Sequence, residues 1–215
     1  MKLYYGLIIL MILFNNIHAQ VTDVDGQTYK TVKIGNQIWL AENLNVSHFR
    51  NGDPIMEAKT NEEWIKAAKE KKPAWCYYNN DTANGKIYGK LYNWYAVTDY
   101  RGLAPEGWHI PSSSEWAIMM AYLGGSTNST GQKIKATEGW IENGNSNNSS
   151  GFTALPGGFR NDFPTFAFLL YKAGWWTITP TSYDQARYFY LENNNNCGLD
   201  IALKSFGFSV RCIKD

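Results

Sequence analysis

Residues 111–125, Pro-Ser-Ser-Ser-Glu-Trp-Ala-Ile-Met-Met-Ala-Tyr-Leu-Gly-Gly, carry the clearest structural signal in this chain. Ser112 and Glu115 have the spacing of a capping box, in which each side chain accepts a hydrogen bond from the backbone of the other residue at a helix N-terminus. The apolar residues that follow recur at helical spacing and predict one buried face: Trp116, Met119, Met120 and Leu123. Gly124 and Gly125 suit the left-handed turn that ends a helix. The stretch therefore predicts one complete, capped helix.

A second helix of the same design is predicted upstream. Thr60 and Glu63 form another capping box. The apolar residues of its buried stripe are Trp64, Ile65 and Ala68. Lysines at 69 and 71–72 would lie near the C-terminus of this helix, where positive charge interacts favourably with the helix dipole. Pro73 ends the helix.

Strand patterns flank these two helices. Residues 27–34 and 37–40 are strand-like, and Gly35-Asn36 between them predicts a hairpin. Near the C-terminus, apolar residues alternate with others over 199–203 and again over 206–212. A tight turn between these segments would pair them with their apolar faces together. Two helices placed apart from a late run of strands predict an α+β fold.

Three further segments are less regular. Residues 75–78 favour a short strand, and residues 89–95 are apolar enough to be buried as either a helix or a strand. Residues 143–151 are rich in Asn, Ser and Gly without an apolar period, which predicts a surface loop.

The first nineteen residues are predicted to be a cleavable signal peptide. Lys2 supplies a positive charge, and residues 7–14 form an apolar run that is far shorter than the roughly 20 residues of a membrane span. Cleavage after Ala19 would leave Gln20 as the new N-terminus. No cysteine follows the cleavage position, so a lipid anchor is not expected. The sequence thus predicts a secreted protein, periplasmic or extracellular, with residues 20–215 as a single domain.

Composition narrows the range of partners and cofactors. The chain has 20 basic and 19 acidic residues, so the protein is close to neutral and lacks the excess positive charge that nucleic-acid binding needs. His48 and His109 are the histidines left after signal removal, and neither a CxxC nor an HExxH motif occurs. The opening of residues 23–26 looks like a calcium loop, but the later positions of such a loop do not match. The sequence predicts no metal and no cofactor.

Three cysteines, Cys76, Cys197 and Cys212, leave the disulfide question open. An exported protein meets an oxidising compartment, so one bridge could form and one thiol would remain. In the predicted C-terminal hairpin Leu199 lies opposite Cys212, which puts Cys197 on the diagonal. Diagonal Cβ atoms are about 7 Å apart, so a Cys197–Cys212 bridge needs a bulge or a shifted register. A buried free Cys212 is the alternative.

The resemblance to a known family rests on five segments in order: 23–44, 89–94, 105–111, 152–160 and 207–215. They resemble the Fibrobacter succinogenes major paralogous domain, a family similar to the formylglycine-generating-enzyme branch of the C-type-lectin-like fold. The resemblance implies a single C-type-lectin-like α+β domain with two main helices, small antiparallel sheets and long loops. Members are typically exported bacterial proteins, often lipoproteins. Ala104 stands where members often carry a cysteine, so the resemblance does not decide whether this chain has a disulfide found in other members.

The catalytic groups of that enzyme branch are not supplied by this sequence. The branch works through a close pair of cysteines, whereas Cys197 and Cys212 lie apart and one of them faces the predicted core. Two histidines cannot supply the three ligands of its iron-dependent relatives, and His109 lies between two apolar residues. A catalytic pair of carboxylates remains an open alternative. No set of nucleophile, base and orienting residue emerges, so we expect a non-catalytic protein and name no catalytic residue.

A binding role is the leading expectation. Trp175 and Trp176 open the densest late group of aromatic residues, which continues with Tyr183, Tyr188 and Tyr190. Neighbours in a strand point to opposite faces, so one of the two Trp would point outward, beside Asn193 and the asparagines after it. Such a surface would bind a glycan, or a surface protein, without calcium. The alternatives are that both Trp close the core, that the protein is a structural or adhesin-type component of a surface assembly, and, less favoured, that it is an enzyme of the formylglycine-generating-like class.

Overall fold

The computed structural model describes residues 20–142, 144 and 146–215. The predicted signal peptide therefore lies outside the described residues, as do Asn143 and Asn145 of the predicted 143–151 loop. The helices are α1 (Asn61–Glu70), the 3₁₀ helix η1 (Tyr78–Asn80), α2 (Thr82–Tyr88), α3 (Trp94–Val97), α4 (Ser113–Leu123) and α5 (Asn128–Ile134). The strands are β1 (Gln20–Thr22), β2 (Thr28–Ile34), β3 (Gln37–Leu40), β4 (Met56–Glu57), β5 (Ala74–Cys76), β6 (Leu91–Tyr92), β7 (Trp108–His109), β8 (Gly157–Arg160), β9 (Phe166–Leu169), β10 (Lys172–Pro180), β11 (Gln185–Glu192), β12 (Cys197–Leu203) and β13 (Ile213–Lys214).

Both predicted helices are confirmed, and each begins at its predicted capping box. Within α1 the predicted apolar stripe is wrong at Ile65, which is 50% exposed, because the buried face runs through Trp64 and Ala67. In α1 the Glu63 backbone N–H donates to Thr60 Oγ1 at 3.1 Å, and Glu63 Oε2 accepts from the Thr60 N–H at 3.0 Å. In α4 the corresponding distances between Ser112 and Glu115 are 3.2 and 2.7 Å. Gly124 ends α4 at a φ of 120°. The 89–95 segment, which periodicity left open, contains both a strand (β6) and a short helix (α3).

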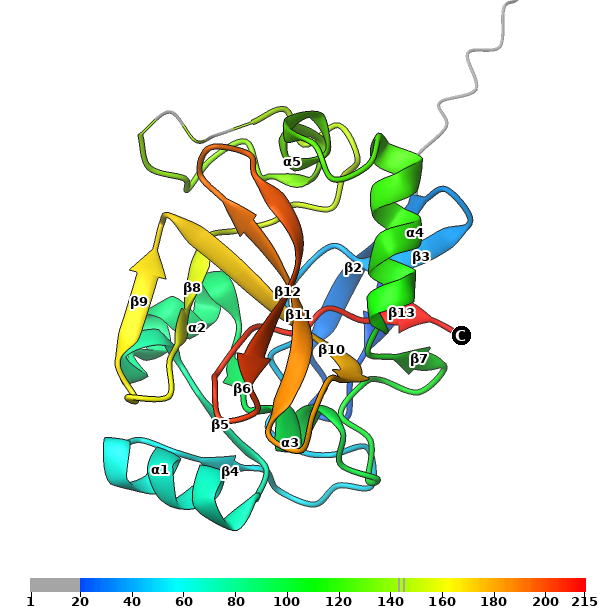
Figure 1. Ribbon diagram of the computed structural model, residues 1–215. Helices are drawn as coiled ribbons and strands as arrows, with labels where there is room; N and C mark the ends of the chain where they lie inside the picture. Colours follow the sequence, from blue (N-terminus) through cyan, green and yellow to red (C-terminus); the bar gives the residue numbers. More distant parts are fainter. Residues whose placement is uncertain (1–19, 143, 145) are drawn as a thin grey trace, which may run out of the picture.

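The first sheet has the strand order β1-β2-β3-β13-β7. The predicted hairpin of β2 and β3 is confirmed, with Ile34 paired with Gln37 across its turn. Strand β13 lies between β3 and β7, where Ile213 pairs with both Trp39 and His109. Figure 1 shows β13 and β7 side by side below α4, with the β2–β3 hairpin behind them. A three-stranded sheet, β4-β5-β6, lies near α1.

The second sheet has the order β12-β11-β10-β8-β9 and corrects the predicted C-terminal hairpin. Strand β12 pairs with β11, not with residues 206–212. Residues 206–212 instead cross the interior and form isolated bridges to Tyr92, Arg160 and Trp175. Alternation correctly marked this segment as extended and apolar, but alternation carries no information on which segment it pairs with. The α+β class is confirmed.

The two fully buried tryptophans of β10 belong to two different core clusters. Trp175 lies with Trp39, Trp116 and Phe152 beneath α4. Trp176 lies in the other cluster. Both faces of β10 are therefore covered at this point of the sheet.

Buried cations are a recurring feature of the interior: Lys90, Lys135, Arg160, Lys204 and Arg211. Each has an aromatic ring nearby and donates hydrogen bonds to backbone carbonyls. Lys135, for example, lies 4.4 Å from the ring of Trp140 and donates to the carbonyl of Asn193 at 2.5 Å. Burial lowers the pKa of Lys135 to about 8. Within residues 20–142, 144 and 146–215, none of the five forms an ion pair with a carboxylate.

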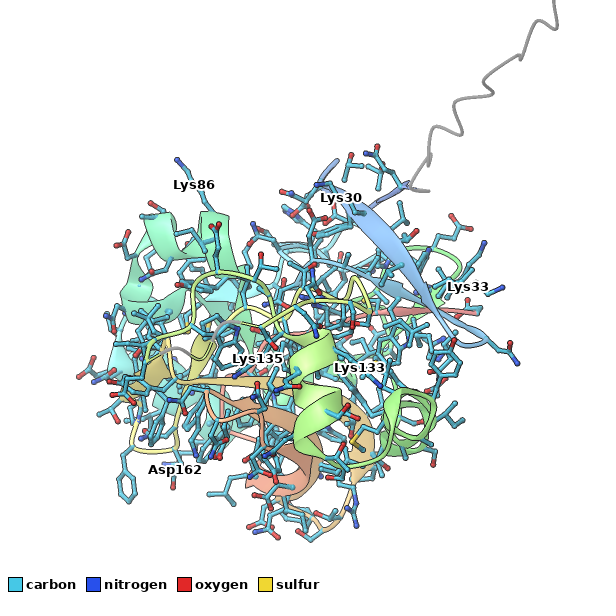
Figure 2. All side chains as sticks on the ribbon, turned by 90° about the horizontal axis from the view of Figure 1, so that it is seen from above. Lys30, Lys33, Lys86, Lys133, Lys135 and Asp162 are labelled. Carbon is cyan, nitrogen blue, oxygen red and sulfur yellow. The ribbon has the colours of Figure 1, made fainter. Side chains whose placement is uncertain are left out.

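Figure 2 shows where several lysines lie when the molecule is seen from above. Lys133 and Lys135 lie close to α5, Lys30 and Lys33 lie on β2, and Lys86 points away from the rest. Lys133 is also engaged, since it donates to the carbonyl of Leu123 at 2.5 Å. The labelled lysines are thus spread over several elements and do not form one continuous basic stripe.

Candidate functional site

The predicted ligand-binding tryptophans are not on the surface. Trp175 and Trp176 are both 0% exposed, so the expectation that one points outward is wrong and the alternative that both close the core is correct. They do point to opposite faces of β10, but α4 covers one face and residues 206–212 cover the other. The indole N–H of Trp175 donates to Asn43 Oδ1 at 2.9 Å, and that of Trp176 donates to the carbonyl of Tyr92 at 2.8 Å.

Tyr183 and Asn193 do not form one site either. Tyr183 precedes β11, is 81% exposed, and has Lys71 Nζ 3.6 Å from its ring centre and hydrogen-bonded to its hydroxyl. Asn193 follows β11, and its backbone is engaged by Tyr171 and Lys135. An eight-residue strand spans roughly 25 Å, so the two side chains lie at opposite ends of the sheet.

The proposed Cys197–Cys212 disulfide is absent, because all three cysteines are free and buried. Cys197 lies in the core cluster of Trp175, and Cys212 lies in that of Trp176. They are apart because the hairpin that would have placed them on one diagonal does not form. Burial raises the pKa of Cys197 to about 11 and that of Cys76 to about 12. Protonated buried thiols are poor nucleophiles.

A different group of residues gathers on the face of β10, β11 and β12 that also carries Trp176, around a cavity of about 230 Å³ that we call the sheet cavity. Its lining residues are Phe159, Lys172, Ala173, Tyr188, Tyr190, Glu192, Asn196 and Asp200. Strand register explains the arrangement, since Lys172 is paired with Glu192 and Tyr188 with Asp200. Alternation along β11 puts Tyr188, Tyr190 and Glu192 on the same face.

The floor of the sheet cavity is aromatic. The Tyr188 ring stacks on Phe208 with centroids 4.4 Å apart and planes at 10°, and Tyr190 follows at 6.4 Å. Phe208 fits because Gly174 lies beneath it: a Cβ added there would lie 2.4 Å from the Phe208 ring. Both tyrosines remain partly exposed.

The rim of the sheet cavity keeps hydrogen-bonding capacity. Lys172 Nζ lies 2.5 Å from Glu192 Oε1, and the Asn196 amide donates to Glu192 Oε2 at 3.3 Å. Burial, and then the neighbouring Asp200 carboxylate, raise the pKa of Tyr188. The Tyr190 hydroxyl makes no hydrogen bond within the part of the chain that the structure describes. This rim can therefore both donate to and accept from a polar ligand.

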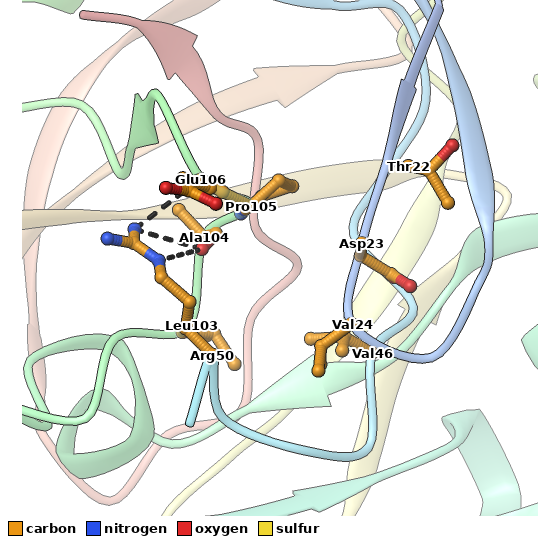
Figure 3. A pocket seen from close by; sticks show the side chains of 9 residues that line it. All are labelled: Thr22, Asp23, Val24, Val46, Arg50, Leu103, Ala104, Pro105 and Glu106. Carbon is orange, nitrogen blue, oxygen red and sulfur yellow. Dashed lines mark hydrogen bonds between the residues drawn. The ribbon is translucent and has the colours of Figure 1, made fainter. Parts of the chain in front are cut away.

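Arg50 and Arg211, which line the other cavities, are already engaged in hydrogen bonds. In a cavity of about 220 Å³ between the β1–β2 turn and residues 103–106, Arg50 donates to the carbonyls of Ala104 and Pro105 at 3.0–3.3 Å (Figure 3). It also donates to the carbonyl of Trp108 at 3.2 Å. A cavity of about 270 Å³ reaches Arg211, which donates to four oxygens of the protein. These guanidinium groups hold loops together, which leaves them little capacity for a ligand.

His109 is held between two carboxylates. Nδ1 lies 2.7 Å from Asp215 Oδ1, and Nε2 lies 2.7 Å from Glu115 Oε1. An ionised carboxylate only accepts hydrogen bonds, so both ring nitrogens must donate and the imidazole is protonated in this arrangement. Burial lowers the pKa of His109, but the bonds to Asp215 and Glu115 outweigh it and the pKa is raised. With no free nitrogen, His109 cannot accept a proton from a nucleophile here.

The His109 contact is expected to make stability fall as the pH rises above about 6.5. A raised pKa gives stabilisation that is complete below the unfolded value of 6.5 and is lost as the pH rises through the folded value. The partly exposed side chain limits the effect to at most about 1 kcal/mol. Urea unfolding at a series of pH values should show this fall in the wild type and not in His109→Gln. Parallel pH curves for the two proteins would contradict the assignment.

Sequence reasoning named Tyr188 and Tyr190 as part of an aromatic group, but missed Lys172, Glu192 and Asp200. Alternation within β11 contains a signal for Glu192, because it follows the two tyrosines at a spacing of two. Lys172 and Asp200 come from neighbouring strands, so only the pairing register could have revealed them.

The described residues offer neither a cluster of metal ligands nor a membrane-spanning helix. No three His, Cys, Asp or Glu side chains in this part of the chain gather where they could hold a metal ion. No helix among the same residues has the length and apolar character needed to cross a bilayer.

Comparison with known proteins gives one match. The family model of the Fibrobacter succinogenes major domain matches residues 32–214, which is most of the chain. No curated protein and no solved structure matches significantly. The matched range includes both capped helices and every strand from β3 to β13. The chain belongs to the Fibrobacter succinogenes major domain family.

Proposed function

We propose that this protein is an exported, non-catalytic domain that binds a neutral glycan at the sheet cavity without calcium. The observation that carries the proposal is the pairing of two partly exposed tyrosine rings with a polar rim on one sheet face. Aromatic faces can cover the C–H face of a sugar ring, and carboxylate, amide and phenol groups can bond its hydroxyls. The rim carries two carboxylates, Glu192 and Asp200, and one ammonium, Lys172, and this excess of negative charge disfavours an anionic ligand.

The size of the cavity supports a small recognition unit. Pockets for drug-sized ligands are typically 300–1,000 Å³. The sheet cavity, at about 230 Å³, is smaller and suits a single ring. The engaged nitrogens of His109 and the buried thiols favour binding over catalysis by these groups.

Two further parts of the proposal concern export and fold. The sequence of residues 1–19 supports removal of a signal peptide after Ala19, and N-terminal sequencing of the protein from the medium or periplasm should then begin at Gln20. The family membership, the two capped helices and the antiparallel strand pairs support a C-type-lectin-like arrangement.

Tyr190→Ala is expected to weaken glycan binding at least about tenfold, because it removes a ring face and a free hydroxyl from the cavity. Glycan-array screening of the wild type followed by calorimetry measures this. The matched control is Tyr100→Ala, since Tyr100 is 94% exposed and lies outside the cavity lining.

Two results would overturn the proposal: no glycan bound by the wild type, or equal losses in both variants. A partner protein recovered from the native host, with no glycan bound, would favour the alternative role as a structural or adhesin-type component of a surface assembly.

A further inference from the structure

The aromatic surface does not stop at the sheet cavity. Phe206 lies 5.7 Å from Phe208, Phe159 lies 6.0 Å from Phe206, and Phe168 lies 5.5 Å from Phe159, all between ring centres. Phe206 and Phe159 are partly exposed, and Phe168 is exposed. Phe208 is buried and packs against Tyr188, Phe206 and Phe159. We call the exposed and partly exposed rings of this series the aromatic track: Tyr190, Tyr188, Phe206, Phe159 and Phe168.

The track crosses several strands. Tyr190 is on β11, Phe159 is on β8 and Phe168 is on the edge strand β9, in a sheet ordered β11-β10-β8-β9. Three inter-strand spacings of about 4.8 Å give a length of roughly 14 Å. Figure 1 shows these strands arranged from β9 at the left edge to β11 near the centre.

Phe168 has a backbone conformation that burial does not explain. Its φ is +62°, in the left-handed region that a bulky residue rarely adopts, and its side chain is 48% exposed. Lys172 Nζ lies 4.9 Å from its ring centre, which joins Phe168 to the rim of the sheet cavity. Unfavourable backbone geometry that holds an exposed ring is a feature of binding sites.

We infer that the aromatic track binds successive sugar units of an extended glycan chain, so that the ligand is a polysaccharide and not an isolated terminal sugar. This inference rests on the proposed function. The sheet cavity, which Phe159 also lines, would hold one unit, and Phe206 and Phe168 would contact the units that follow. The charged groups along the track, Lys172, Glu192 and Asp200, favour a hydroxyl-bearing chain over an apolar peptide segment.

Chain-length dependence tests the inference. The probes are glucose, mannose and N-acetylglucosamine with their oligomers of up to six units, and calorimetry measures each affinity. Wild-type affinity is expected to rise at least about tenfold from one unit to the longer oligomers. In Phe168→Asn this rise should shrink several-fold, and the affinity for the single sugar should change by a smaller factor than the affinity for the hexamer.

The variants separate a binding role from a structural role. Asn tolerates a positive φ, so the melting temperature of Phe168→Asn should be unchanged or higher. Phe163→Asn is the matched control, because Phe163 is 78% exposed and is outside the aromatic track, and it should keep the full length dependence.

Three results would overturn the inference. Equal affinity for a single sugar and its hexamer would leave the sheet cavity as a terminal-sugar site. A lower melting temperature with unchanged length dependence in Phe168→Asn would make Phe168 structural. Absence of any glycan binding by the wild type would overturn both this inference and the proposed function.

Discussion

Arg211→Met is expected to destabilise the protein by at least about 3 kcal/mol. Arg211 is buried and donates to Asn43 Oδ1 and to the carbonyls of Leu40, Phe152 and Thr153 at 2.7–3.0 Å. Methionine can fill much of the volume but donates nothing. Asn43 Oδ1 keeps its hydrogen bond from Trp175, so the three carbonyls are the acceptors that lose this donor. Each buried acceptor left without a donor costs about 1–3 kcal/mol.

Urea unfolding at neutral pH measures this loss. Arg187→Met is the matched control, because Arg187 is only partly buried and its side chain makes no hydrogen bond or ion pair within the described residues. That variant should change stability by no more than about 0.5 kcal/mol. A loss below about 2 kcal/mol for Arg211→Met would mean that water replaces the missing donor.

Trp116→Ala is expected to cost about 3–5 kcal/mol, the range for removing a large buried ring. Trp116 lies at the centre of the α4 core: it stacks on Phe189 at 4.3 Å and 10°, and Trp39, Phe152 and Trp175 surround it within 6 Å. The buried Nε1 of Trp116 has no hydrogen-bond partner among the described residues.

Trp116→Phe provides the control, because it keeps a ring for the stack and removes the unsatisfied N–H. It should cost much less, about 1–2 kcal/mol. Thermal or urea unfolding of the two variants distinguishes them. Equal losses in Trp116→Ala and Trp116→Phe would show that a phenyl ring cannot replace the indole, and that stability at this position depends on the full volume of the indole.

Local signals in the sequence predicted the parts of the fold that depend on local chemistry. The capping boxes at Thr60 and Ser112 located two helices, because capping uses residues three positions apart. The Gly35-Asn36 turn located the first hairpin, because the residues that form a hairpin turn are neighbours in the sequence. Strand pairing over long separations could not be predicted this way, so residues 206–212 were given the wrong partner.

The candidate site shows the same limit. The aromatic group was recognised, but the exposed members are Tyr188 and Tyr190, not Trp175 or Trp176. Alternation gives the two faces of a strand without telling which face is covered, and β10 is covered on both. Buried Arg211 was not predicted to be structural, because a charged side chain in a strand pattern normally indicates an exposed position.

The place of β13 between β3 and β7 has a consequence for folding kinetics. Ile213 completes the first sheet by pairing with Trp39, which lies near the other end of the described chain, and Arg211 ties the same region to residues 152–153. Contacts of such long sequence separation form only after a large loss of chain entropy, and folding dominated by them is slow. The chain would therefore stay unfolded for longer after synthesis than a helical protein of its size, an interval in which it could still be threaded through a narrow translocation channel.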